Sequence, residues 1–196
     1  MIAHARALIS EGGIEGLSLN EVLRLAGGSK ATLVKYFGDR SGLVSAAIAE
    51  EAREAMAALR LETDGLAGAP LAEGLRALLN GVLRFYLQPG SLALYRAVVA
   101  MGGQDRSVAA ALYDHGHRQV VETVAALLHA RASSGNANDA RLRDMAEQLV
   151  HAIRAGLHER ALLGLAALPA TEEEIAGRID ATLALILPGL ESALRA

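Results

Sequence analysis

Residues 18–38, which read SLNEVLRLAGGSKATLVKYFG, decide the fold of this chain. Ser18 and Glu21 stand three residues apart, in the spacing of a capping box, where each side chain bonds to the backbone N–H of the other residue. This pair predicts a helix that begins at Leu19. Gly27-Gly28 ends that helix after about two turns, because glycine after a short helix is a C-terminal stop signal.

A second short helix follows the glycine turn. Ser29 is an N-cap residue, and residues 30–36 are compatible with a helix up to the interruption at Phe37-Gly38-Asp39. Upstream, an apolar face that ends at Gly12-Gly13 predicts a first helix, which completes a three-helix unit. Two short helices joined by a tight turn have the helix-turn-helix geometry, in which the second helix lies in the major groove of DNA.

The second of these two helices carries the side chains that DNA binding requires. The chain has only two lysines, Lys30 and Lys35, and both lie on this helix. Cations and hydroxyls hold phosphates and base edges, while Leu33 and Phe37 can face inward. The residues predicted to contact DNA are Ser18, Ser29, Lys30, Thr32, Lys35, Tyr36 and Arg40. We expect the cations and Tyr36 at phosphates, and Thr32 and Ser29 near base edges.

The rest of the chain also favours helices. Its 52% hydrophobic content includes only 3% aromatic residues, with many Ala, Leu and Arg residues that enter helices at little cost. Apolar residues recur at helical spacing, and the four prolines are placed to open or close helices. Helices are expected near 40–62, 71–87, 92–101, 108–132 with a kink at Gly116, 142–157 and 172–194, with a loop at 133–138. We predict an all-α protein with a helix-turn-helix domain at 1–43 and a larger helical domain at 44–196.

Composition and charge exclude several classes of protein. There is no cysteine, and no apolar stretch is long enough for a membrane span, so we expect a cytoplasmic protein without disulfides. The net charge of -3 argues against a protein that coats nucleic acid with its whole surface. No arrangement of nucleophile, base and acid, no phosphate-binding glycine loop and no metal-ligand spacing occurs, so we expect no enzyme, metal or cofactor.

The first quarter of the chain resembles a known family. Residues 18–22 and 26–43 look like the DNA-binding signature of the TetR family, and residues 94–100 and 109–113 look like the C-terminal domain of its AefR-like branch. Leu23, Gly28 and Val34 stand where the family usually has Ala, Val and an aromatic residue. The resemblance implies a dimer whose last two long helices form a four-helix interface, and an effector pocket in the larger domain.

Two further sets of residues follow from this resemblance. The apolar stripe of the last helix fits either an intramolecular core or a dimer seam, since both have the same periodicity, and the resemblance favours the seam. The predicted interface residues are Leu157, Ile175, Ile179, Leu183, Ile186 and Leu190. The predicted effector pocket, for a small apolar or weakly polar molecule, is lined by Phe85, Tyr86, Tyr95, Met101, Tyr113, His151 and Arg154.

The sequence therefore predicts a homodimeric repressor of a double-stranded DNA operator, released by a small-molecule effector. The alternative is a helical ligand-binding dimer whose helix-turn-helix no longer binds DNA. Residues 1–50 carry five basic residues, Arg6, Arg24, Lys30, Lys35 and Arg40, against five acidic ones, Glu11, Glu15, Glu21, Asp39 and Glu50. This balance predicts weak nonspecific DNA binding.

Overall fold

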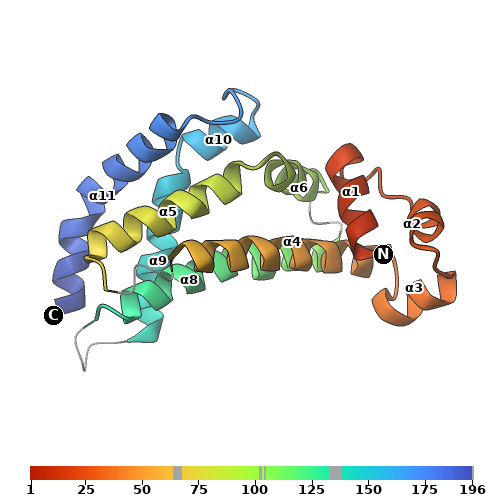
Figure 1. Ribbon diagram of the computed structural model, residues 1–196, viewed down its shortest axis with the longest axis horizontal. Helices are drawn as coiled ribbons and strands as arrows, with labels where there is room; N and C mark the ends of the chain where they lie inside the picture. Colours follow the sequence, from red (N-terminus) through yellow and green to blue (C-terminus); the bar gives the residue numbers. More distant parts are fainter. Residues whose placement is uncertain (64–67, 102, 104, 133–137, 196) are drawn as a thin grey trace. The chain divides into compact units, whose positions relative to one another are not determined.

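The computed structural model describes residues 1–63, 68–101, 103, 105–132 and 138–195 (Figure 1). These residues form helices joined by turns and loops, with no strand among them, as the sequence predicts. The chain divides into two compact units. Unit 1 is made of Met1–Ala55 and Pro89–Arg118, and unit 2 of Met56–Gln88 and Gln119–Ala196.

Unit 1 contains the predicted three-helix unit and three further helical segments. Its elements are α1 (Ile2–Gly12), α2 (Leu19–Ala26), α3 (Lys30–Phe37), the first part of α4 (Arg40–Thr63), α6 (Pro89–Ala100), α7 (Arg106–Ala111) and the π-helical turn η2 (Leu112–His117). One apolar core joins them: Val22 of α2, Leu33 of α3 and Leu43 of α4 are buried together with Val108 of α7. The helix-turn-helix therefore shares its core with α7.

This division differs from the predicted boundary between residues 43 and 44. Residues 89–118 were expected in the larger domain, yet they pack with the helix-turn-helix. Side chains of α6, among them Leu94 and Val98, lie against the same core as Ala5 and Ile9 of α1. Sequence periodicity shows that a helix has an apolar face, but it does not show which neighbour covers that face.

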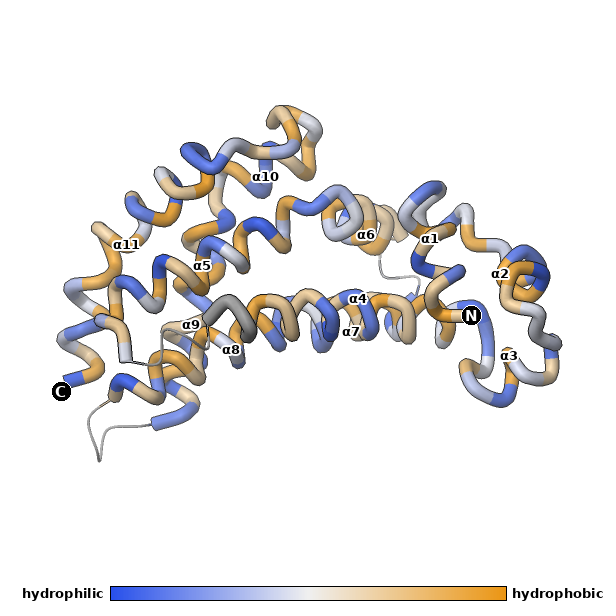
Figure 2. The backbone as a smooth tube through the Cα atoms, in the orientation of Figure 1, coloured by the Kyte–Doolittle hydropathy of each residue, from blue (hydrophilic) through white to orange (hydrophobic). Residues whose placement is uncertain are grey.

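Unit 2 is built around α5 (Leu71–Leu87). Its other elements are the end of α4, α8 (Arg118–His129), α9 (Asp139–Arg154), α10 (Leu157–Leu162) and α11 (Glu172–Arg195). Helix α5 packs against α9, α10 and α11, and it lies beside α11 in Figure 1. Apolar and polar residues are interspersed along α5 and α11 (Figure 2). The buried residues of α11, such as Ile175, Ile179 and Leu183, recur every four residues, so this helix turns one apolar face to its neighbours.

Several predicted helices have different ends from those expected. The helix expected at 108–132 is interrupted by η2, which contains the buried Gly116. Helix α9 stops at Arg154, because Gly156 adopts a positive φ of 82° before α10 begins. Pro188 was expected to open or close a helix and instead lies inside α11. Residues 133–137 of the predicted loop lie outside the described residues, and Asn138 caps α9.

None of the described helices combines the length and the apolar character that crossing a membrane requires.

Candidate DNA-binding interface

Serine caps set the start of both short helices. Ser18 Oγ accepts from the backbone N–H of Glu21 at 3.4 Å, and Ser29 Oγ accepts from that of Thr32 at 3.1 Å. The glycine turn between the helices begins with Gly27 in the left-handed conformation, at φ 63°. These local signals fix the bounds of α2 and α3, and both bounds agree with the prediction to within a residue.

The predicted capping box is only half formed. Glu21 does not reach back to the N–H of Ser18, because its carboxylate is engaged by Arg24, at 2.6 Å and 2.9 Å. Arg24 lies three residues further on the same helix face, and its planar guanidinium can bind both carboxylate oxygens. This pairing lowers the pKa of the Glu21 carboxyl. Arg24 is therefore paired on the surface of α2.

Helix α3 presents most of its surface to solvent. Leu33 is buried at 2% exposure, whereas Val34 and Tyr36 are 52% and 69% exposed. Residues turn by about 100° each in a helix, so Ala31 and Lys35 lie opposite Leu33, flanked by Thr32 and Val34. Lys30 and Tyr36 lie at the two sides of the exposed surface. Helix α3 therefore packs on one face and leaves the other exposed to solvent.

Thr32 is already engaged within α3. Its hydroxyl lies 2.9 Å from that of Ser29, the N-cap residue. Lys35 lies over the ring of Tyr36, with Nζ 5.4 Å from the ring centroid. Both pairs are exposed, so they are accessible to a partner on the solvent side.

Arg40, one of the predicted DNA contacts, makes hydrogen bonds within the helix-turn-helix. Its Nε donates to the carbonyl of Leu17 at 3.2 Å, and its Nη2 donates to the carbonyls of Ile14 and Glu15. The guanidinium therefore ties the start of α4 to the connection between α1 and α2. Arg40 was predicted at a DNA phosphate; its Nε and Nη2 groups make hydrogen bonds within the helix-turn-helix.

The turn from α3 to α4 is fixed by two residues that the sequence reasoning did not single out. Asp39 Oδ1 accepts from the backbone N–H of Gly42 at 2.9 Å. A Cβ at Gly42 would overlap the carbonyl oxygen of Phe37, so no other residue fits without a backbone shift. Asp39 directly precedes the first residue of α4, and Asp is a common N-cap residue, so this cap could have been predicted from the sequence.

The space beside Gly28 is filled by a flexible side chain. A Cβ at this position would overlap the terminal methyl group of Met1. The Met1 side chain, which packs against the unit 1 core, therefore occupies the space that a larger residue at position 28 would fill.

Two domain families match separate parts of this chain. One, described as bacterial regulatory proteins of the tetR family, matches residues 1–47. The other, described as the AefR-like transcriptional repressor C-terminal domain, matches residues 73–188, which is more than half of the chain. This protein belongs to the TetR family of bacterial transcriptional regulators.

Solved structures of TetR-family members share the fold. A protein from Mesorhizobium loti MAFF303099 described as a TetR-family transcriptional regulator is 19% identical, with a TM-score of 0.79 over 96% of this chain and 93% of that one. The flavonoid-responsive regulator FrrA is 26% identical, with a TM-score of 0.73 over the same shares. A TetR transcriptional regulator from Agrobacterium tumefaciens is 27% identical, with a TM-score of 0.64 over 94% and 90%. No curated protein matches the chain.

The effector residues predicted for this TetR-family regulator fall in both units. Tyr95, Met101 and Tyr113 belong to unit 1; Phe85, Tyr86, His151 and Arg154 belong to unit 2. Tyr113 is half exposed, and the Arg118 guanidinium lies 5.6 Å from its ring centroid. Tyr95 and Met101 are half-buried on α6 and at its end.

In unit 2 three of the predicted pocket residues, Phe85, Tyr86 and Arg154, come together with His158. The ring centroids of Phe85 and Tyr86 are 5.6 Å apart. Arg154 of α9 stacks on Tyr86 of α5, with its guanidinium carbon 4.4 Å from the ring centroid. The ring of His158 on α10 meets Tyr86 edge-on at 5.4 Å, and the Arg154 Nε donates to His158 Nδ1 at 3.4 Å. Burial and the Arg154 charge lower the pKa of His158 to about 4. The imidazole is therefore neutral at pH 7, beside a cation and an aromatic ring.

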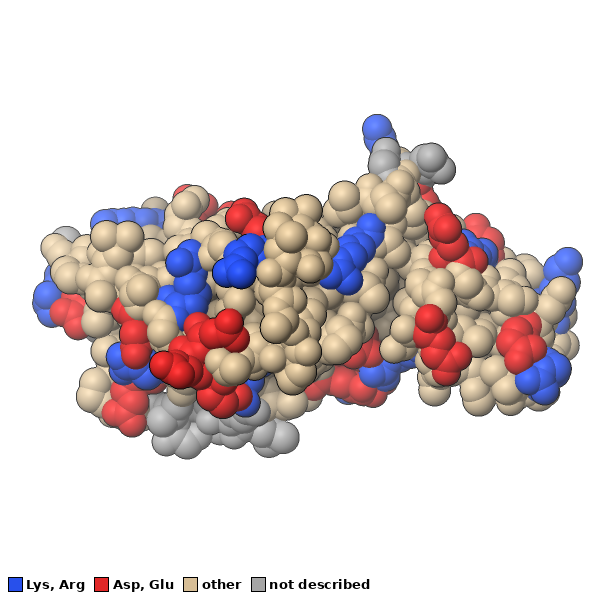
Figure 3. Space-filling model, turned by 90° about the horizontal axis from the view of Figure 1, so that it is seen from above, with Lys and Arg blue, Asp and Glu red and all other residues tan. Residues whose placement is uncertain are grey.

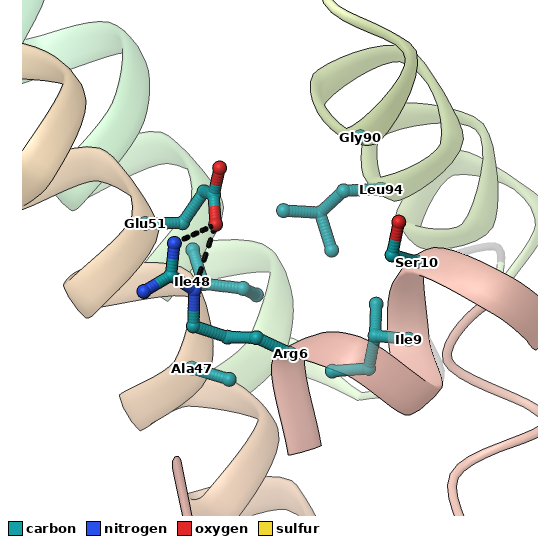
Figure 4. Close-up of a pocket in the computed structure, with 8 residues that line it drawn as sticks. All are labelled: Arg6, Ile9, Ser10, Ala47, Ile48, Glu51, Gly90 and Leu94. Atoms are coloured by element: carbon teal, nitrogen blue, oxygen red, sulfur yellow. Dashed lines mark hydrogen bonds and ion pairs between the residues drawn. The ribbon is translucent and has the colours of Figure 1, made fainter. Parts of the chain in front are cut away.

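Unit 1 contains a cavity of about 80 Å³ that the sequence did not indicate. Figure 4 shows Ile9 and Ser10 of α1, Ile48 of α4 and Leu94 of α6 around it. The ion pair between Arg6 and Glu51 lies at one side of the cavity, and Arg6 also binds Glu54 at 2.7 Å. These pairs join α1 to α4, and the hydrogen bonds to Glu54 and Glu51 raise the pKa of Arg6.

The residues predicted at the dimer interface divide into two groups. Ile175, Ile179, Leu183 and Leu190 are buried within unit 2, at 4% exposure or less, and so have little surface left for a second copy. These four residues form the core beneath α11. Leu157 and Ile186 are half-buried. The neighbouring Leu185, which the stripe did not include, is 82% exposed.

Charged residues of both signs are intermingled on the face of the molecule shown in Figure 3. In the helix-turn-helix, Lys30 and Lys35 are exposed, while Arg24 and Arg40 have the partners described above. Two lysines on α3 therefore provide the positive charge that this interface offers to a phosphate backbone.

Proposed function

We propose that this TetR-family regulator is a dimeric repressor that binds a double-stranded DNA operator through α3 of each subunit and leaves it when a small effector binds. The observation that carries the proposal is the surface of α3, which buries Leu33 and exposes both lysines of the chain. In helix-turn-helix dimers the two half-sites lie about 34–36 Å apart, so the operator is expected to be pseudo-palindromic.

We propose roles for the exposed side chains of α3 other than Ala31. The sequence predicted Lys35 at a phosphate. Because Lys35 lies opposite the buried Leu33 and so enters the groove deepest, we assign it instead to the acceptors of a guanine base edge. Thr32 and the methyl groups of Val34 flank it and face neighbouring base edges, including thymine methyl groups. Lys30 and Tyr36, at the sides of the helix, are assigned to phosphates, as are the N-terminal turns capped by Ser18 and Ser29.

A second copy of the chain is proposed to cover the exposed face of α11. This face carries Leu185 with the small exposed residues Ala181, Ala184 and Gly189, which allow close approach of another helix. Monomeric proteins rarely leave large apolar patches exposed. The proposed seam is therefore rotated around α11, away from the buried Leu183.

Sedimentation tests this seam. Leu185→Arg should give a folded monomer, while Val99→Arg, at an exposed position on α6, should leave the dimer intact. Leu183→Arg should unfold unit 2 instead, because it places an unpaired charge in the core. A folded dimer of the Leu185→Arg variant would show that the seam lies elsewhere.

The effector is proposed to be a flat, weakly polar aromatic molecule that binds beside Tyr86 and Arg154. An aromatic ring and a guanidinium suit a ligand with an aromatic body and a phenolic or carboxylic oxygen. The similar FrrA is flavonoid-responsive, which supports this class of compound. Release of DNA requires the effector to bind the DNA-incompetent state more tightly.

Thermal shift with a panel of flavones and flavanones, followed by operator release, tests the effector class. Arg154→Met should weaken the binding of any hit that carries an acidic hydroxyl or carboxylate. The control is Arg160→Met, on the exposed side of α10. Equal affinity of both variants for the hit would place the effector elsewhere.

Footprinting on the DNA upstream of the regulator's own gene tests the repressor itself. We expect protection of one symmetric site, bound about 10³-fold or more tightly than a scrambled sequence at physiological salt. Equal binding to both sequences would instead support a ligand-binding dimer whose helix-turn-helix has lost DNA recognition.

A further inference from the structure

Asp105, the residue before α7, uses its two carboxylate oxygens for two different tasks. Oδ1 caps α7, accepting from the backbone N–H groups of Ser107 at 3.0 Å and Val108 at 3.2 Å, and from the Ser107 hydroxyl at 2.7 Å. Oδ2 accepts from the hydroxyl of Ser41, which lies 64 residues away in the first turn of α4. One carboxylate thus joins the start of α7 to the start of α4.

Ser41, which donates to Asp105, lies between two residues that hold the helix-turn-helix in place. Arg40, on one side of Ser41, binds the carbonyls between α1 and α2. Gly42, on the other side, lies directly against the carbonyl of Phe37 at the end of α3. A rotation of this turn of α4 would therefore move both ends of the helix-turn-helix.

Apolar packing alone does not fix that rotation. Val108 and Ala111 of α7 share a core with Leu33 and Leu43, but apolar burial is non-directional. The Ser41–Asp105 hydrogen bond has a donor, an acceptor and a preferred angle, and the carboxylate makes it stronger than a neutral bond. The hydroxyl and N–H donors around Asp105 lower its pKa to about 2, so the charge is present throughout the neutral range.

We propose that Ser41 and Asp105 are positioning residues for operator recognition: their hydrogen bond holds α4, and through it the recognition helix α3, in the orientation that reads DNA. The proposal rests on the proposed DNA-binding function. It also connects the start of α7 to the recognition helix through α4.

The test compares specific with nonspecific binding in variants that keep the α7 cap. Ser41→Ala removes the link and leaves Asp105 as the cap; Asp105→Ser keeps an N-cap residue that is too short to reach Ser41. Each should weaken operator binding about tenfold, the double variant should be no weaker than the single ones, and binding to scrambled DNA should stay unchanged. Ser41→Thr, which keeps the hydroxyl, should restore operator binding, and Ser107→Ala should leave it unchanged.

A purely structural role gives a different result. It would lower the unfolding temperature, but the folded variants would keep the wild-type ratio of operator affinity to scrambled-DNA affinity. An unchanged affinity ratio would overturn the proposal. Amide exchange gives a readout without DNA: Ser41→Ala should speed exchange in α2 and α3 but not in α5, and unchanged exchange would also count against the link. If the wild type itself shows no operator preference, the proposed function fails first.

Discussion

Units 1 and 2 differ in where their long-range polar contacts lie. In unit 1, single polar side chains reach distant points of the chain: Arg40 binds the carbonyls between α1 and α2, and Asp105 binds Ser41. In unit 2, long apolar helix faces pack together around α5, which buries leucines such as Leu75 and Leu79 completely. Directional bonds fix an angle, whereas apolar burial supplies free energy without fixing one. Both units have an apolar core, and unit 2 also has long-range ion pairs, Arg76–Asp180 and Arg84–Glu172, on its exposed surface. In unit 1 the long-range bonds of Arg40 and Asp105 instead lie at the helix ends that position α3.

The largest expected effect separates stability from DNA binding. Leu79→Ala should lower the free energy of unfolding by about 2–5 kcal/mol, because it removes a fully buried side chain and leaves a cavity. The folded protein should keep its operator affinity. Urea denaturation and fluorescence anisotropy measure the two quantities. Leu163→Ala, at an exposed position, is the control and should change stability by less than about 0.5 kcal/mol. If folded Leu79→Ala binds the operator more weakly, then packing in unit 2 also controls DNA binding, and the two units do not differ in this respect.

A pH dependence of stability is expected from unit 2. His158 has a pKa of about 4 in the folded chain, below its ordinary value of 6.5, because burial and Arg154 disfavour its charge. Between these values the unfolded chain binds a proton that the folded chain does not. The free energy of unfolding should therefore be constant above pH 6.5 and fall by up to about 3 kcal/mol as the pH drops to 4. His158→Gln should remove this component of the dependence, while exposed His151→Gln should keep it.

Arg40 gives a smaller effect with a distinct signature. Arg40→Met leaves backbone carbonyls without their donor and should cost about 1–3 kcal/mol of stability. The salt slope of DNA binding should stay unchanged, since the guanidinium faces the α1–α2 connection. Arg24→Met, on the exposed surface of α2, should cost little stability. If Arg40→Met reduces the salt slope by about one, Arg40 contacts a DNA phosphate.

Local sequence signals were sufficient for the helix-turn-helix. Ser18, Gly27 and Ser29 act through hydrogen bonds and backbone angles within a few residues, so their patterns can be read directly from the chain. The family resemblance covered the same stretch, and the all-α class followed from composition. The pairing of Glu21 with Arg24 was missed because two short-range partners competed for one carboxylate.

The contacts that assemble the units could not be predicted in this way. Arg40 meets Leu17 and Asp105 meets Ser41 across 23 and 64 residues, and no periodicity encodes such partners. The stripe of α11 was assigned to a dimer seam, although α5 and α9 of the same chain cover it. A periodic apolar face has the same pattern in both cases. Residues 89–118 pack with the helix-turn-helix through long-range contacts. Periodicity does not encode these contacts either.

Salt-dependent DNA affinities of two lysine variants test most directly whether the exposed face of α3 reads DNA. Lys35→Ala should reduce the preference for the operator over scrambled DNA by about 1–3 kcal/mol, because a base contact is lost. Lys30→Ala should weaken binding to both sequences equally and reduce the salt slope by about one, because a phosphate contact is lost. If Lys35→Ala keeps the wild-type preference and neither variant changes the salt slope, α3 does not lie in the major groove and the account is contradicted.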